Sequence, residues 1–86
     1  MEQSKSSERF TFDRPGKYLI RVQGFLDESW SERMGGLSIT KRNLNDLGPV
    51  TSLAGQLRDQ TELAGVLNTL YELHLPLLLV EYLYDR

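Results

Sequence analysis

The side chains that could do chemistry are few, and their spacing assembles no familiar catalytic or metal-binding set. His74 is the only histidine and there is no cysteine, so a zinc site and a thiolate nucleophile both lack their usual groups. Three of the serines lie within the first seven residues, and no histidine near them could act as a base. Neither a dinucleotide-binding GxGxxG run nor a P-loop occurs. We therefore predict no catalytic residue, no metal and no cofactor.

The remaining candidates have structural explanations that compete with functional ones. Trp30 and Met34 are four residues apart and would share one face of a helix. Such a pair usually belongs to the core, but together with Gln60 it could line a small ligand pocket. His74 follows a helical pattern, where it can cap the last carbonyl groups of the helix. We keep Trp30, Met34 and Gln60 as a candidate pocket.

Length, composition and charge restrict the function classes. With 86 residues the chain makes one domain with a small core. A net charge of −2 offers no basic face for nucleic acid. The longest apolar run, over 75–80, is too short for a membrane span, and the first ten residues lack the apolar segment of a signal peptide. We expect a cytoplasmic protein that binds neither nucleic acid nor membrane.

Hydropathy periodicity predicts four strands and two helices. Alternating apolar residues indicate strands, and apolar residues at three- and four-residue steps indicate helices. The expected strands cover 17–23, 37–41, 51–57 and 77–84, and the expected helices cover 28–34 and 60–73. Asp27 and Asp59 are suited to cap the two helices, and Pro76 cannot continue the second one. Gly65, inside the second helix, would fit a close approach of that helix to the sheet.

Two segments differ in composition. Residues 1–16 are mostly polar and aperiodic, which is typical of a flexible tail, although 10–12 could form a short extra strand. Residues 17–86 carry the periodic patterns. We therefore expect a single domain over 17–86, preceded by the tail.

The element order β-α-β-β-α-β predicts an α+β, ferredoxin-like sandwich. In that fold a four-stranded antiparallel sheet carries one long and one short helix on one face. Its usual strand order, 4-1-3-2, places the first strand beside the fourth. Aligning these two strands by their alternation sets Arg21 opposite Glu81 on the open face of the sheet. The residues expected on that face include Leu19, Arg21, Phe25, Leu77, Leu79, Glu81 and Leu83.

Several residues form a spaced pattern that resembles a known family. It begins with Tyr-x-Ile-Arg-Val-x-Gly-x-Leu-Asp-x-x-Trp at Tyr18 and ends with Asp-Gln-x-x-Leu-x-Gly-x-Leu at Asp59. Over roughly 18–83 the chain resembles a family of short, uncharacterised ferredoxin-like bacterial proteins, mostly from cyanobacteria and other environmental bacteria. The resemblance implies the fold and brings no activity with it. Similar sequences often carry Gly at the helix end, where this chain has His74.

The apolar residues expected on the open face decide the functional prediction. Leaving a large apolar side chain in water forfeits about 1.5–3 kcal/mol, and a contiguous apolar patch on a monomer usually marks an interface. We predict a small non-catalytic interaction or regulatory module that forms a homodimer through this open face. The alternative is a sensor domain that binds a small molecule, and an enzyme of the dimeric α/β-barrel kind ranks last.

Overall fold

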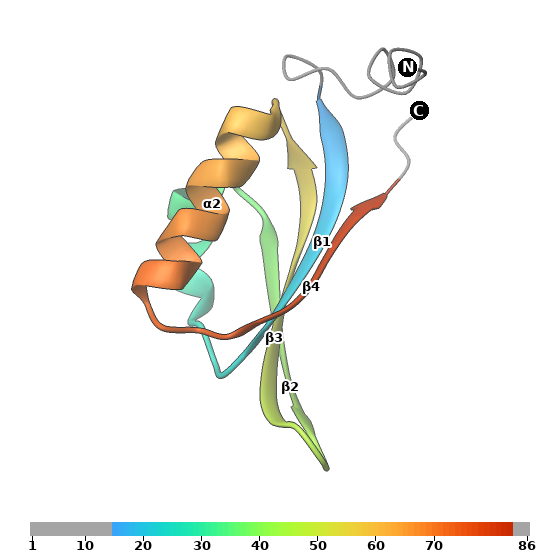
Figure 1. Ribbon diagram of the computed structural model, residues 1–86, viewed down its shortest axis with the longest axis vertical. Helices are drawn as coiled ribbons and strands as arrows, with labels where there is room; N and C mark the ends of the chain where they lie inside the picture. Colours follow the sequence, from blue (N-terminus) through green and yellow to red (C-terminus); the bar gives the residue numbers. More distant parts are fainter. Residues whose placement is uncertain (1–14, 84–86) are drawn as a thin grey trace, which may run out of the picture.

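The computed structural model describes residues 15–83, which form one sheet and two helices (Figure 1). In chain order the elements are β1 (Gly16–Gln23), η1 (Glu28–Met34), β2 (Ser38–Leu44), β3 (Gly48–Leu57), α2 (Gln60–Glu72) and β4 (Leu77–Leu83). The class is α+β, as predicted, with an open four-stranded antiparallel sheet. The expected tail over 1–16, with its extra strand over 10–12, lies outside the described residues except for Pro15 and for Gly16, which already belongs to β1.

The strands lie across the sheet in the order β2-β3-β1-β4. Each neighbouring pair is antiparallel, and the predicted pairing of the first strand with the last is present. Both helices cover the same face of the sheet (Figure 1). We call this face the helix side and the opposite one the open face. Within residues 15–83, β2 and β4 are the two edge strands.

The core lies between the two helices and the middle of the sheet. Even-numbered residues of β1 are buried and the odd-numbered ones are not, as a strand with one covered face requires. The buried apolar cluster consists of Tyr18, Ile20, Val22, Leu26, Met34, Leu37, Leu53, Leu57, Val66 and Leu70. β1, η1, β3 and α2 supply members of this cluster, and Leu37 lies directly before β2, whereas β4 supplies none.

The first helix is a 3-10 helix, not the α-helix that the spacing suggested. Asp27 caps it, because its carboxylate accepts the backbone N–H of Ser29 at 3.1 Å. Hydrogen bonds from the Ser29 side chain and backbone hold the pKa of Asp27 below its usual value. Gly35 ends the helix with φ of 67°, which glycine adopts without steric cost. A 3-10 helix rises about 2 Å per residue against about 1.5 Å in an α-helix, so these residues span a longer gap between β1 and β2.

The hairpin of β2 and β3 is longer than the sequence indicated. The expected loop around Asn43 and Gly48 is largely strand, because the ladder continues until Leu44 pairs with Gly48. Only residues 45–47 remain as the turn. The hairpin therefore projects beyond the helices at the lower end of the molecule (Figure 1).

The register between β1 and β4 is shifted by two residues from the predicted one. Arg21 lies opposite Leu79, and Leu19 lies opposite Glu81, whereas the prediction paired Arg21 with Glu81. A shift by an even number of residues keeps every side chain on its face of the sheet. Arg21 and Glu81 therefore share the open face, as predicted, without facing each other.

An irregularity at the start of β4 changes the side on which Leu77 lies. Beyond Arg21 the ladder is interrupted, and Val22 pairs with Leu77 so that Leu78 is the extra residue of a bulge. Because Val22 is buried on the helix side, Leu77 lies there too, and its predicted position on the open face is wrong. The alignment of Arg21 with Glu81 also implied a pairing of Phe25 with Leu77, but Phe25 lies beyond the end of β1, so that pairing does not form.

The N-terminus of α2 has the reciprocal caps that the sequence predicts. Asp59 accepts the backbone N–H of Glu62 at 2.9 Å, and the Glu62 carboxylate accepts the backbone N–H of Arg58 at 2.8 Å. The expected reason for Gly65 is wrong, because a Cβ at this position would meet no atom within 4 Å. Neither helix in the range 15–83 is long and apolar enough to cross a membrane.

Candidate functional site

Exposed apolar side chains gather along β4 on its helix side. Val80 pairs with Ile20 and Tyr82 pairs with Tyr18, and both β1 residues are buried beneath the helices, which places Val80 and Tyr82 on the same side. α2 packs against η1 and β3 and leaves this part of β4 uncovered. We call the three large apolar residues placed here, each between 39% and 52% exposed, the β4 strip: Leu77, Val80 and Tyr82.

Tyr82 is held in place by its neighbours on β1. Its ring meets the ring of Tyr18 edge to face, with centroids 5.3 Å apart at 67°, a geometry that aromatic pairs prefer. It also lies over Gly16, where a Cβ would collide with the ring. The β4 strip therefore ends in an anchored aromatic side chain, so one end of this surface has a fixed shape.

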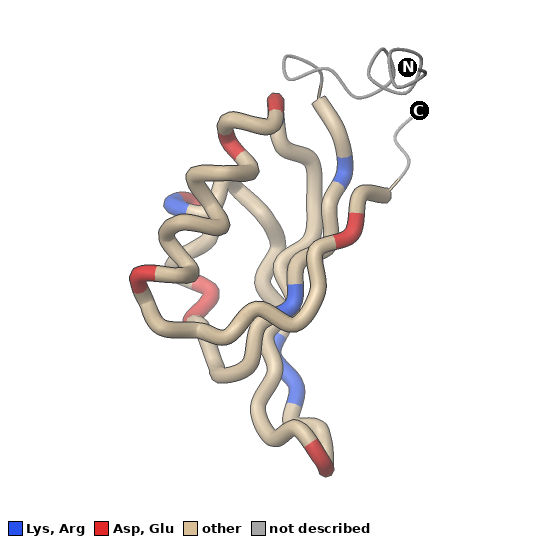
Figure 2. The backbone as a smooth tube through the Cα atoms, viewed as in Figure 1, with Lys and Arg blue, Asp and Glu red and all other residues tan. Residues whose placement is uncertain are grey.

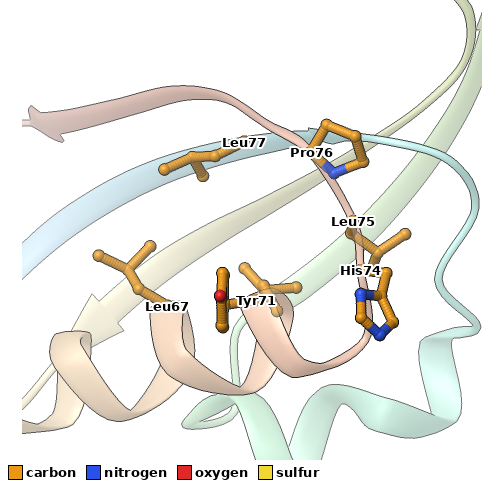
Figure 3. Close-up of a pocket in the computed structure, with 7 residues that line it drawn as sticks. Leu67, Tyr71, His74, Leu75, Pro76 and Leu77 are labelled. Carbon is orange, nitrogen blue, oxygen red and sulfur yellow. The ribbon is translucent and has the colours of Figure 1, made fainter.

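A groove of about 360 Å³ separates α2 from β4 and continues the β4 strip towards the helix end (Figure 3). Leu67 and Tyr71 rise from α2, and Leu77 lies across from them on β4 (Figure 3). The residues that line it are Leu67, Leu70, Tyr71, His74, Leu75, Pro76 and Leu77. Its volume is in the range of small-ligand sites. The lining is apolar except for the Tyr71 hydroxyl and the His74 ring, so the groove suits an apolar group with a hydrogen-bonding end.

His74 lies where α2 ends and the groove begins. Its φ of 62° is the only positive one outside glycine within residues 15–83. Its N–H donates to the carbonyl of Tyr71 at 3.0 Å, and the N–H of Leu75 donates to the carbonyl of Leu70 at 3.2 Å. This is the Schellman cap, whose left-handed position usually holds glycine. The backbone, not the ring as we expected, caps these carbonyls, and the imidazole is left to line the groove.

The open face is mixed in character. Figure 2 shows most of the basic residues along the strands and most of the acidic ones on or beside the helices. Lys17, Arg21 and Arg42 lie on the open face by their register, and the Arg21 Nε–H donates to the Ser52 hydroxyl at 3.3 Å. A shallow hollow of about 310 Å³ is lined there by Leu19, Arg21, Thr40, Arg42, Leu44, Val50 and Ser52. The open face is therefore not the contiguous apolar patch that the sequence suggested.

The structure places the candidate pocket residues at the η1 side of the molecule, away from the groove. Met34 is fully buried in the core and Trp30 packs against it half-buried, with the Arg33 guanidinium 5.0 Å from the ring centroid in a cation–π contact. Gln60 is the first residue of α2. None of the three lines the groove or the hollow. Within the described chain, no group of three or more His, Cys, Asp or Glu side chains could hold a metal ion.

The sequence predicted correctly that several interface candidates share one face, but it did not predict the more exposed apolar residues of β4. The structure places five of the predicted residues together on the open face: Leu19, Arg21, Leu79, Glu81 and Leu83. It separates Leu77 and Phe25 from them. The predicted alternation had placed Val80 and Tyr82 on the helix side, beneath the helices. The signal that could have found them is the unbroken apolar run from Leu77 to Val80, because such a run needs cover on both faces of the strand.

The chain matches the family model of the domain of unknown function DUF8691 over residues 17–81. The matched span begins in β1 and ends in β4, so it contains both helices and the whole sheet except the first residue of β1 and the last two residues of β4. The chain belongs to this family. Comparisons with curated proteins and with solved structures found no match. The DUF8691 span includes the groove and most of the β4 strip, so these surfaces are part of the family domain and not an addition to it.

Proposed function

We propose that this chain is a small non-catalytic interaction or regulatory module that self-associates through the β4 strip. One observation carries the proposal: large apolar side chains line the uncovered side of a strand that is itself an edge of the described sheet. Each such side chain left in water forfeits about 1.5–3 kcal/mol. Edge strands of monomeric proteins are usually protected by charges or by cover, and β4 has a single charged side chain, Glu81, which points to the open face.

The charges of the open face favour β4 over the surface first predicted. Packing two open faces together would gather Lys17, Arg21 and Arg42 of both copies in one interface. Like charges brought together at an interface cost several kcal/mol. The β4 strip contains no charged residue, so its burial carries no such cost.

The proposal also covers the fold family, the bacterial origin and the cellular compartment. Counted from the β4 edge, the strand order is 4-1-3-2, which supports a ferredoxin-like assignment with η1 in place of the first α-helix. We propose a bacterial and cytoplasmic setting from the resemblance and from the absence of cysteine, which suits a reducing compartment.

Light scattering combined with size-exclusion chromatography tests the self-association. At high micromolar concentration we expect about twice the 9.9 kDa mass of one chain. Val80→Lys should weaken the dimer by at least about tenfold, because lysine on an edge strand opposes pairing. Leu47→Lys is the matched control, since Leu47 is similarly exposed but lies in the β2–β3 turn, and it should leave the dimer unchanged. A monomer at all concentrations, or equal weakening by both variants, would contradict the proposal.

The groove between α2 and β4 favours a second candidate function, a sensor that binds a small molecule. Its support is His74, a non-glycine residue in the left-handed region whose ring lines the groove. Strained residues of this kind cluster at functional sites. A thermal-shift screen of amino acids, nucleotides and flavins should find a ligand that raises the melting temperature.

His74→Gly separates a ligand-binding role of His74 from a structural one. The variant should be more stable than the unmodified chain by about 1 kcal/mol without ligand, because glycine adopts the left-handed conformation freely. If the sensor function holds, the same variant should lose most of the ligand-induced shift. A shift that survives unchanged in His74→Gly would show that the ring does not bind the ligand.

A further inference from the structure

We infer that β4 pairs antiparallel with β4 of a second copy, with the two-fold axis at Val80, so that two sheets become one. This inference rests on the self-association proposed above and names its partner and register. Among residues 15–83, β4 pairs with β1 alone, so one side of its backbone faces away from the sheet. An axis perpendicular to the sheet would keep both sets of helices on the same face.

The backbone hydrogen bonds show which residues of β4 point outwards. The N–H of Gln23 donates to Pro76 beside β4, and the N–H of Gly24 donates to Pro49 of β3. Backbone groups alternate between the two sides of a strand, so the odd-numbered residues of β1 point to β4. Their partners Leu79 and Glu81 point back to β1. The N–H and C=O groups of Val80, which lies between them, therefore point away from β1.

Pairing opposite Val80 uses these outward groups and avoids two conflicts. An axis at Val80 sets Val80 opposite the partner's Val80, where the two residues exchange two backbone hydrogen bonds. Moving the axis to Glu81 would place two carboxylates directly opposite, which is destabilising. Moving it to Leu79 would bring the partner's Pro76 into the ladder, and proline has no N–H to donate. Of the three registers, the one at Val80 avoids both the facing carboxylates and the proline.

The side chains on both faces fit this register. On the open face Leu79 would lie opposite the partner's Glu81, and Leu79 would separate this carboxylate from Arg21, which neighbours Leu79 on β1. On the helix side Val80 would meet the partner's Val80 in the middle of the paired β4 strips. The two grooves between α2 and β4 would then lie on the same side of the joined sheet, on either side of the paired β4 strips.

Single cysteines test the register, because the chain has none of its own. Cα atoms of a hydrogen-bonded antiparallel pair are about 5.5 Å apart, which a disulfide can bridge. Under mild oxidation Val80→Cys should become a covalent dimer, whereas Leu47→Cys at the hairpin turn should stay mostly monomeric on a denaturing gel. Leu79→Cys and Glu81→Cys should each form few cross-links alone and many when mixed.

The outcomes distinguish this inference from the proposed function. If light scattering shows a dimer but Val80→Cys cross-links no faster than Leu47→Cys, the register is wrong while self-association stands. If the unmodified chain is a monomer, both are overturned. A disulfide within one chain in the Thr11→Cys, Val80→Cys double variant would overturn the inference as well, because the chain's own N-terminal segment would then occupy the β4 edge.

Discussion

One row of residues across the sheet contains both buried and exposed side chains of the helix side. Leu53 of β3, Ile20 of β1 and Val80 of β4 lie side by side, and all three are aliphatic residues that point to the same face. Leu53 and Ile20 are 0% exposed, whereas Val80 is 39% exposed. The difference comes from where α2 lies and not from the residues. α2 covers β3 and η1 and stops short of β4.

This contrast shows what divides the covered from the uncovered part of the sheet. Leu70 of α2 and Leu75 of the segment after it line one wall of the groove, and Leu77 of β4 lines the other. The groove is therefore the boundary between the covered and the uncovered part of the sheet. On one side of it apolar residues hold the domain together. On the other side residues of the same kind add little to the stability of a single chain and are available to a partner.

The largest expected effect is the difference between Leu53→Ala and Val80→Ala in one chain. Leu53→Ala should lower the free energy of unfolding by about 2–5 kcal/mol, because it leaves a cavity in the closed core. Val80→Ala should lower it by less than about 1 kcal/mol, since much of that side chain is already in water. Urea unfolding below the concentration of association measures both. Equal losses would mean that the β4 strip is covered within the single chain.

Thr51→Val tests the buried part of the sheet, and we expect a loss of unfolding free energy between those of Leu53→Ala and Val80→Ala. Thr51 is fully buried; its hydroxyl donates to the carbonyl of Gly24 at 2.7 Å and accepts the N–H of Leu26 at 3.0 Å. Valine fills the same space and leaves both backbone groups unpaired, which should cost about 1–3 kcal/mol. Thr40→Val, at an exposed position of β2, should change stability by less than about 0.5 kcal/mol. If Thr51→Val changed stability by as little as Thr40→Val, a water molecule would have to take over the hydrogen bonds of the lost hydroxyl.

Local features of the structure could be predicted from the sequence, whereas features set by packing could not. The alternation from Tyr18 to Val22 placed the strand and its buried face correctly, and the spacing of Asp59 and Glu62 located the helix start, because both depend on neighbours in sequence. The bulge at Leu78 shifts pairing with a strand more than fifty residues away, and nothing local specifies it. The position of α2 over β3 is likewise a packing result.

The candidate site was mislocated for the same reason. The prediction assumed that two helices cover all four strands, so it placed Val80 and Tyr82 in the core and looked for the interface on the other face. The hydroxyl of Thr51 was also missed, since its partners at Gly24 and Leu26 come together only when the chain turns after β1. A patch defined by missing cover can be found only once the covering element is placed.

Gly65→Ala, for which we expect the smallest effect, tests whether the surface that a partner contacts extends from β4 onto α2. Gly65 and Gly48 both have open space around a built Cβ, but only Gly48 has a positive φ, of 75°. Gly65→Ala should raise the free energy of unfolding by about 1 kcal/mol, or about 4–8 °C in melting temperature for a domain of this size. Gly48→Ala, the matched control, should lower it by about 1–2 kcal/mol. A rise at Gly65 with unchanged association would confine the interface to β4 and the groove. A rise with weaker association would instead show that the partner approaches the exposed surface of α2 closely enough to need a residue without a side chain.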